Sequence, residues 1–205
     1  MKLQLALDRL SKERCFQLVK ETEESIDIIE VGTGVIKEYG MAIVRELRAQ
    51  FPNKEILADM KTCDAGKHET LQAFNAGVDI TTVMAFSAIS TIKDTLNIAR
   101  DKNKRIMIDL LECHSNDRIK ELVDIGVNLV SLHVGKDKQS EGTFNTELFS
   151  LVEGYNLEVA VAGGITLETL PEIVKEKPDI IIVGSAITKA GNPAKVAREM
   201  QDMLV

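Results

Sequence analysis

The stretch "AGVDITTV", residues 76–83, runs from a glycine through a polar residue into a series of β-branched and apolar residues. "IGVNLVSL" at 125–132 and "EKPDIIIV" at 176–183 repeat this order, the latter with proline in place of glycine. Glycine and proline at such a position are helix-ending signals, whereas a short β-branched run favours a strand. Each stretch therefore predicts that a helix ends and a strand begins.

Similar apolar runs recur along the whole chain and provide eight strand candidates. These are residues 3–8, 27–32, 55–60, 80–85, 105–111, 129–134, 158–163 and 180–185. Between them, apolar residues recur with the helical period, for example in 41–51 and 166–177. The repeat of strand plus helix is roughly 25 residues long, which is typical of parallel neighbouring strands.

Eight such units with nearly continuous apolar strands predict an α/β protein, a single (β/α)8 TIM barrel covered by helices. An open doubly wound sheet is the alternative. That fold needs no eighth strand and usually carries G-x-G-x-x-G after the first one, whereas "LDRLSKE" (7–13) stands there in this chain. No linker or shift in composition divides the sequence, so we expect residues 1–205 to form one domain.

The composition is that of a globular protein, with 44% hydrophobic and 28% charged residues. The net charge of -7 argues against nucleic acid or an anionic membrane as a partner. No apolar run reaches the roughly 18 residues of a membrane span, and we expect a cytoplasmic protein. Cys15, Cys63 and Cys113 form no C-x-x-C pair, and we interpret them as reduced, structural thiols.

Ionisable residues stand at the predicted carboxyl ends of five strands, the rim where barrels of this kind carry their active sites. They are Asp8, Glu30, Asp59, Lys61, Asp109 and His133. One such residue alone is more often a helix cap or a structural histidine. Several of them converging on one small volume repel one another unless a cation or a substrate is bound. We therefore interpret the group as a functional site.

The segment "LADMKTCDAG", residues 57–66, places three charges within six positions. Residues two apart in a strand point the same way, so Asp59 and Lys61 should face the barrel interior, with Asp64 at its mouth. Carboxylates on either side should keep Lys61 protonated. A protonated lysine suits donation to a developing oxyanion better than Schiff-base formation.

Glu30 and Asp59 end neighbouring strands and offer hard oxygen ligands. Two carboxylates, completed by water and substrate oxygens, are a usual way to hold Mg²⁺. Zinc is disfavoured, because Cys113 and His114 are adjacent and no second Cys/His pair stands at ligand spacing. The sequence therefore predicts a magnesium site between the second and third strands.

Glycine directly follows the last two strand candidates, in "VAGGIT" (161–166) and "VGSAIT" (183–188). Glycine lets backbone N–H groups approach an anion closely, and the loops after strands seven and eight often bind phosphate in such barrels. Ordinary tight turns are the structural alternative. We predict a phosphate site at Gly163, Gly164, Gly184 and Ser185.

Together these motifs resemble the orotidine-monophosphate-decarboxylase suprafamily, whose mark at the third strand is D-x-K-x-x-D, here residues 59–64. Within it, "LQLALD", "DIIEVGTG", "ILADMKTCDAG", "HVGKDKQ" and "VAVAGGI" place the resemblance nearest the 3-hexulose-6-phosphate synthase family, essentially end to end. The resemblance implies a Mg²⁺-dependent aldolase. Its members interconvert D-ribulose 5-phosphate plus formaldehyde and D-arabino-hex-3-ulose 6-phosphate through an enediolate.

The resemblance also implies a role for each residue. Glu30 and Asp59 would hold Mg²⁺, Lys61 would donate to the enediolate, and His133 would move protons. Asp8, Asp64 and Asp109 would orient substrate hydroxyls and Lys61, and the glycines with Ser185 would take the phosphate. A homodimer with shared active sites is implied as well, in which Asp64 reaches the partner's site.

Two alternatives stay open. The family of 3-keto-L-gulonate-6-phosphate decarboxylases typically has arginine where this chain has Lys136 and Ser185, which favours the synthase. Glu112 departs in the other direction, since a small or apolar residue is typical of the synthase there, and its carboxylate could reshape the pocket. The second alternative is a non-catalytic barrel that binds sugar phosphates. The intact set of metal and proton-transfer residues argues against it.

Overall fold

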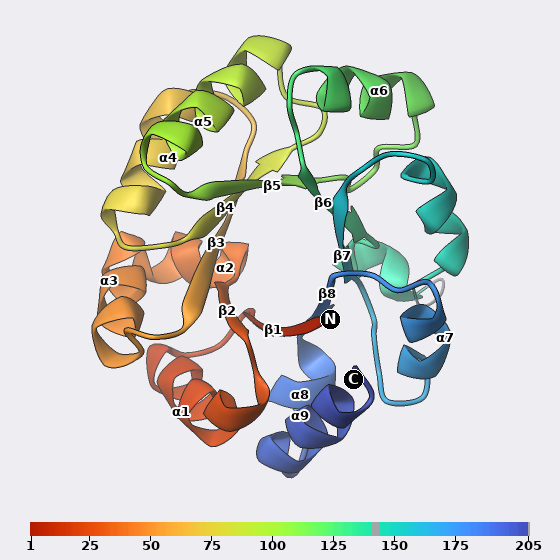
Figure 1. Ribbon diagram of the computed structural model, residues 1–205. Helices are drawn as coiled ribbons and strands as arrows, with labels where there is room; N and C mark the ends of the chain where they lie inside the picture. The colour runs from red at the N-terminus through yellow and green to blue at the C-terminus, as the bar shows by residue number, and fades with distance from the viewer. Residues whose placement is uncertain (141–143, 205) are drawn as a thin grey trace.

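The computed structural model describes residues 1–140 and 144–204. Within these residues, eight parallel strands close into a barrel in chain order, and β1 pairs with β8 (Figure 1). The strands are β1 (Lys2–Leu7), β2 (Ile28–Val31), β3 (Glu55–Thr62), β4 (Ile80–Met84), β5 (Arg105–Asp109), β6 (Leu129–His133), β7 (Glu158–Ala162) and β8 (Ile180–Val183). The predicted (β/α)8 barrel is confirmed, and the open sheet is wrong.

Helices surround the barrel on its outer side (Figure 1). The α-helices are α1 (Lys12–Thr22), α2 (Thr33–Tyr39), α3 (Met41–Gln50), α4 (Gly66–Asn75), α5 (Ile89–Asp101), α6 (Asn116–Asp124), α7 (Leu170–Lys175), α8 (Ser185–Thr188) and α9 (Pro193–Asp202); the 3-10 helices are η1 (Glu23–Ser25), η2 (Lys136–Ser140) and η3 (Thr146–Leu151). None of the helices in the described ranges combines the length and apolar character that crossing a bilayer requires.

The helix predicted for residues 166–177 is shorter than expected. Thr166 and Thr169 form a turn, in which each hydroxyl accepts a hydrogen bond from the other residue's backbone N–H. Helix α7 begins only after this turn, with Pro171 in its first positions. The link from β6 to β7 differs more, because its described part carries η2 and η3 in place of an α-helix. There Phe144 is buried and packs edge to face on Phe149.

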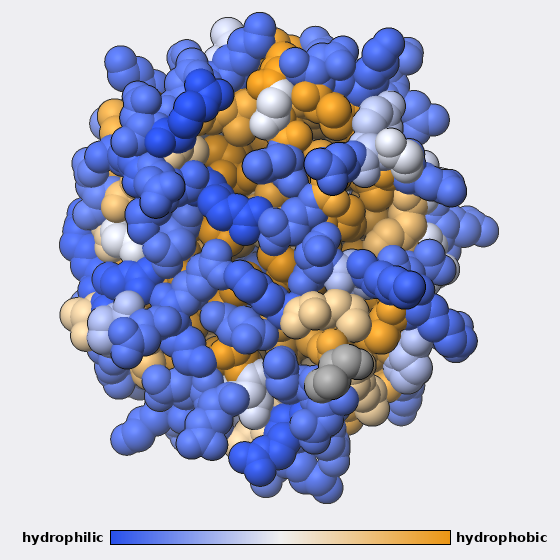
Figure 2. Space-filling view, viewed as in Figure 1, coloured by the Kyte–Doolittle hydropathy of each residue, from blue (hydrophilic) through white to orange (hydrophobic). Residues whose placement is uncertain are grey.

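Alternation along the strands produces two apolar layers. One lies between the strands and the helices; the other fills the barrel interior with Ala6, Ile28, Leu57, Ile80, Met107, Leu129, Ala160, Ala162, Ile180 and Ile182. Figure 2 shows hydrophilic side chains over most of the outer ring, with hydrophobic surface mainly in the gaps between them. Side chains thus fill the barrel, and a ligand has access only at a rim.

The aspartate in front of three of the even-numbered strands has a defined task at the amino-terminal rim. Asp27, Asp79 and Asp179 precede β2, β4 and β8, and each carboxylate accepts a backbone N–H from the preceding strand. Asp79 also pairs with Arg48 and, at 2.6 Å, with Lys104. Its partial burial would raise its pKa, but these hydrogen bonds outweigh burial, so the pKa lies below its usual value. This rim serves cohesion of the barrel.

Candidate active site

A cavity of about 630 Å³ opens at the carboxyl ends of the strands. Of the predicted site residues it is lined by Asp8, Glu30, Asp59, Lys61, Asp109, His133, Gly163, Gly164, Gly184 and Ser185. Its volume suits a small metabolite. The prediction that charges scattered along the chain meet at one rim is therefore confirmed for all of them except Asp64.

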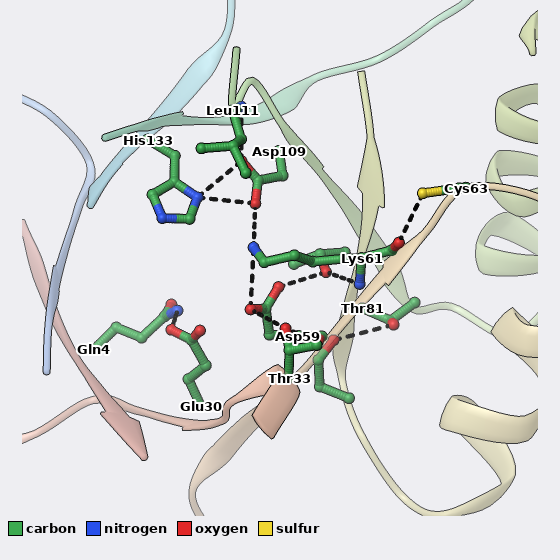
Figure 3. A network of polar contacts seen from close by, with 12 residues as sticks. Gln4, Glu30, Thr33, Asp59, Lys61, Cys63, Thr81, Asp109, Leu111 and His133 are labelled. Atoms are coloured by element: carbon green, nitrogen blue, oxygen red, sulfur yellow. Dashed lines mark hydrogen bonds and ion pairs between the residues drawn. The ribbon is translucent and has the colours of Figure 1, made fainter. Parts of the chain in front are cut away.

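Lys61 leaves the strand geometry in a way that aims its side chain across the barrel. Its φ of 48° is left-handed, and the register between β3 and β4 shifts between Ala58 and Thr62. The backbone N–H of Lys61 donates to Thr82 Oγ1 at 2.9 Å. This bulge places Lys61 Nζ 3.2 Å from Asp59 Oδ2 and 2.5 Å from Asp109 Oδ2 (Figure 3).

The prediction that Lys61 lies between the carboxylates of Asp59 and Asp64 is wrong for Asp64. The chain turns away after Thr62, and Ala65 takes up a left-handed conformation ahead of α4. Asp64 therefore lies exposed and outside the cavity of its own chain. The second carboxylate against the ammonium comes from Asp109 at the end of β5.

The electrostatic consequence for Lys61 nevertheless agrees with the prediction. Burial alone would lower its pKa, but the charges and hydrogen bonds of Asp59 and Asp109 raise it well above the ordinary value. The amine is therefore an ammonium at neutral pH. An ammonium is a proton and hydrogen-bond donor, and it lacks the lone pair that a Schiff base requires.

His133 completes this group through the same carboxylate. Its Nδ1 lies 3.0 Å from Asp109 Oδ2 and 3.1 Å from Oδ1. Burial would raise the pKa of Asp109, but His133 and Lys61 lower it to about 2, so the carboxylate stays ionised. It accepts the Nδ1 proton, which leaves Nε2 of the ring available to a ligand. A histidine held in this way can accept and return a proton.

Asp59 is held by hydroxyl groups that sequence reasoning missed. Thr82 donates to Oδ1 and Thr33 to Oδ2, each at 2.8 Å. Thr82 could have been found from the sequence. It lies two residues after Ile80 in the strand predicted at 80–85, so both side chains point into the barrel. Thr33 opens α2, and no local pattern pointed to its partner on another strand.

The carboxylates of Glu30, Asp8 and Asp59 lie close enough to one another to repel. Glu30 is 7% exposed, and burial together with repulsion from Asp59 and Asp8 raises its pKa to about 8. At the mouth, desolvation and Asp59 also raise the pKa of Asp8. Such a set of oxygen donors fits a hard divalent cation, which would relieve the repulsion.

Glu30 and Asp59 alone would not complete a metal's coordination. Across residues 1–140 and 144–204, no three His, Cys, Asp or Glu side chains are grouped closely enough to hold an ion by themselves. Mg²⁺ usually keeps several waters and binds substrate oxygens besides one or two carboxylates. The two residues therefore fit Mg²⁺ better than a metal that demands an all-protein cage.

The glycine turns lie across the cavity, after β7 and β8. Gly163 has a φ of 121°, and a Cβ there would come within 2.5 Å of the Val134 carbonyl oxygen, so only glycine fits. Gly164 and Gly184 also line the cavity. The flexible cations Arg9, Lys136 and Lys189 stand around the same opening. Backbone N–H groups and cations on this side suit an anionic group.

Glu112 takes no part in the main cavity. It is exposed, and its carboxylate accepts from Lys138 Nζ at 2.8 Å. The suggestion that Glu112 reshapes the pocket is therefore wrong. Lys136 and Ser185, which distinguish the two enzyme alternatives, both line the cavity.

A (β/α)8 barrel with a lysine between two aspartates at this rim defines a class of enzymes, and the chain belongs to it. Residues 1–200 match the orotidine 5'-phosphate decarboxylase / HUMPS family. The chain is 39% identical, over 208 residues, to 3-hexulose-6-phosphate synthase of Bacillus subtilis (strain 168), covering 100% of this chain and 99% of that protein. The predicted resemblance is confirmed.

Solved structures extend the likeness to three dimensions. The crystal structure of 3-hexulose-6-phosphate synthase from Salmonella typhimurium has a TM-score of 0.96 and 34% identity, covering 100% of this chain and 98% of that one. That of 3-keto-L-gulonate-6-phosphate decarboxylase from Vibrio cholerae O1 has a TM-score of 0.86 and 27% identity, covering 99% and 96%. The fold is common to both alternatives, while sequence identity is higher to the synthase.

Proposed function

We propose that the protein is a Mg²⁺-dependent aldolase that interconverts D-ribulose 5-phosphate plus formaldehyde and D-arabino-hex-3-ulose 6-phosphate. The observation that carries the proposal is the joint placement of Lys61, Asp109 and His133 beside Glu30 and Asp59 in one cavity. Similarity to synthases over the full chain supports the choice of substrates.

Binding of the ketose phosphate would use both sides of the cavity. The backbone at Gly163, Gly164 and Gly184 and the hydroxyl of Ser185 would take the phosphate. The sugar would then extend toward Asp59 and Glu30, where its oxygens meet the charged groups. Asp8, at the mouth, would orient the substrate hydroxyls.

Glu30 and Asp59 would hold Mg²⁺. When bound, a divalent cation supplies Lewis-acid stabilisation for negative charge that develops on the ketose oxygens. Lys61, kept charged by Asp59 and Asp109, donates a hydrogen bond to the same developing oxyanion. Chelation should abolish turnover and added Mg²⁺ should restore it, while borohydride should trap no adduct on Lys61. A trapped adduct would contradict this mechanism.

His133 would transfer the proton at the carbon next to the ketose carbonyl. Its Nδ1 proton is held by Asp109, so Nε2 can take that proton as the enediolate forms. In D₂O without formaldehyde, the protein should exchange a hydrogen of the C1 hydroxymethyl group of ribulose 5-phosphate. His133→Asn should slow this exchange by about 100-fold or more, measured by NMR.

A homodimer with shared sites belongs to the proposal. Asp64 is exposed and outside the cavity of its own chain, and Phe86 is a large apolar side chain with 62% of its surface exposed. A partner chain would cover Phe86 and receive Asp64 in its own site. Mixing Asp64→Asn with His133→Asn chains should recover activity that neither has alone. Light scattering should give twice the monomer mass.

A reducing compartment is the expected location. Cys15, Cys63 and Cys113 are free, and Cys15 and Cys113 are buried. Unpaired thiols of this kind support the prediction of a cytoplasmic protein.

The decisive experiment measures two reactions side by side. Formaldehyde consumption with ribulose 5-phosphate reports the synthase, and carbon dioxide release from 3-keto-L-gulonate 6-phosphate reports the decarboxylase. We expect the first to be faster, because Lys136 and Ser185 replace the arginines typical of the second. Turnover of neither, together with binding of the phosphate esters, would support the non-catalytic barrel.

A further inference from the structure

Gln4 is a polar side chain in the apolar floor of the barrel. It is fully buried, and its register neighbours on β2 and β8 are Ile28 and Ile182, both members of the interior apolar cluster. Burying an amide in such surroundings is unfavourable unless both of its ends find partners. Its position therefore calls for a specific interaction.

One end of the amide holds Glu30. Gln4 Nε2 donates to Glu30 Oε2 at 2.6 Å (Figure 3). In the sheet register Ala6, not Gln4, lies beside Glu30, and the methyl group of Ala6 has no donor for a carboxylate. Gln4 reaches it from two residues earlier on the same face of β1.

Among the residues that the structure describes, this hydrogen bond is the sole one that fixes the Glu30 carboxylate. Elsewhere in the described chain no group donates to Glu30, so its other oxygen, Oε1, is left for a ligand. Asp59 differs, because Thr33, Thr82 and Lys61 occupy both of its oxygens. Of the two proposed ligands, Glu30 therefore depends on one neighbour for its orientation.

The other end of the amide is the carbonyl oxygen Oε1. Gln4 Oε1 is buried and accepts no hydrogen bond from the residues that the structure describes. Gln4 nevertheless lines the cavity. An acceptor of this kind is suited to a water molecule in the hydration shell of a cation bound at Glu30.

We infer that Gln4 is a positioning residue of the cation site: it orients Glu30 through Nε2 and offers Oε1 to a hydrating water. The inference rests on the proposed function, since it presupposes that Glu30 binds the ion. Partners of metal ligands typically change metal affinity by about 10- to 100-fold when they are removed. Loss of Gln4 should therefore weaken the cation more than it weakens the fold.

The test measures binding of Mn²⁺, a paramagnetic substitute for Mg²⁺, from the free-ion EPR signal, with Mg²⁺ as competitor. Gln4→Met keeps the length of the side chain and removes both polar ends. Gln201→Met is the matched control, because Gln201 on α9 also has a buried Oε1 without a partner. We expect the Mn²⁺ dissociation constant to rise at least about tenfold in Gln4→Met and to stay unchanged in Gln201→Met.

Gln4→Leu provides a second apolar replacement, and the inference is judged on whichever variant keeps the wild-type circular dichroism and cooperative melting. An unchanged Mn²⁺ affinity in that folded variant overturns the role of Gln4 and leaves the aldolase intact. Wild-type protein that binds no Mn²⁺, with or without ribulose 5-phosphate, overturns the metal mechanism and this inference together.

Discussion

Lys61 and Asp109 lie 48 residues apart in the chain, yet Lys61 Nζ lies 2.5 Å from Asp109 Oδ2. The pair joins the ends of β3 and β5 across the barrel mouth. Because Asp109 also accepts from His133, one carboxylate keeps the proposed oxyanion donor charged and the proposed base in its correct tautomer. In the proposed mechanism, Asp109 would thus couple proton transfer to charge stabilisation.

Replacing Lys61 with methionine should affect both turnover and stability. The aldol reaction should fall by roughly 1000-fold, since one preorganised donor contributes about that much. The free energy of unfolding at pH 7 should drop by about 3 kcal/mol, because the buried Asp109 loses its cationic partner. Steady-state kinetics and urea unfolding measure the two effects.

Lys104→Met is the matched control, because Lys104 also pairs with an aspartate, Asp79, but at the other rim. It should cost some stability and leave turnover unchanged. A Lys61→Met protein with normal turnover would remove Lys61 from the mechanism.

Replacing Glu30 with glutamine should stabilise the metal-free protein at high pH. The pKa of Glu30 is about 8 in the folded state against an ordinary value of 4.5, so the folded state binds the proton more tightly. Stability of the wild type should therefore fall as pH rises from about 4.5 through about 8. Glu30→Gln carries no such charge and should melt higher than wild type at pH 8.5 in EDTA.

Calorimetry with and without Mg²⁺ completes this comparison. Mg²⁺ should raise the melting temperature of the wild type, since a ligand of the folded state stabilises it, and should leave Glu30→Gln unaffected. At pH 4.5 the metal-free proteins should melt alike. A variant that melts lower than wild type at pH 8.5 would show that Glu30 is not destabilising there.

Replacing Gly163 with alanine should disturb the phosphate side of the cavity. The added Cβ would lie 2.5 Å from the Val134 carbonyl oxygen at a backbone φ of 121°. We expect a loss of about 1 to 3 kcal/mol in unfolding free energy and a higher KM for ribulose 5-phosphate. Gly154→Ala separates strain from contact, since Gly154 has a φ of 82° but open space around it. Its KM should equal that of the wild type.

Replacing Asp79 with asparagine should weaken the opposite rim alone. Asp79 accepts from Arg48, Lys104 and the Ile56 N–H, and its pKa is lowered. Its contribution is present above the ordinary value of 3.8 and is lost as pH falls below it. At pH 7 the variant should lose about 1 kcal/mol of stability, with kcat/KM unchanged. Altered kinetics would mean that the two rims are coupled.

The local sequence was sufficient to predict where the strands lie and which rim carries the charged site residues. Short runs of β-branched and apolar residues located every strand. In "AGVDITTV" the polar residue before the strand is Asp79, whose carboxylate accepts a hydrogen bond from the neighbouring strand. The short α7 was not predicted, because its start depends on hydrogen bonds between Thr166 and Thr169 that compete with the helix. The 3-10 helices η2 and η3 in the described part of the link after β6 were not predicted either.

By itself the sequence determined that a barrel forms and that Asp59, Lys61 and His133 lie at its carboxyl rim. Spacing along the strand sets which way Asp59 and His133 point, whereas the bulge at Lys61 sets the direction of the lysine. Only the tertiary structure decided which of them touch. It paired Lys61 with Asp109 in place of Asp64, and Glu30 with Gln4. The physical reason is that closure of the barrel sets the register between strands, and that register brings together residues whose distance in the chain carries no information about contact.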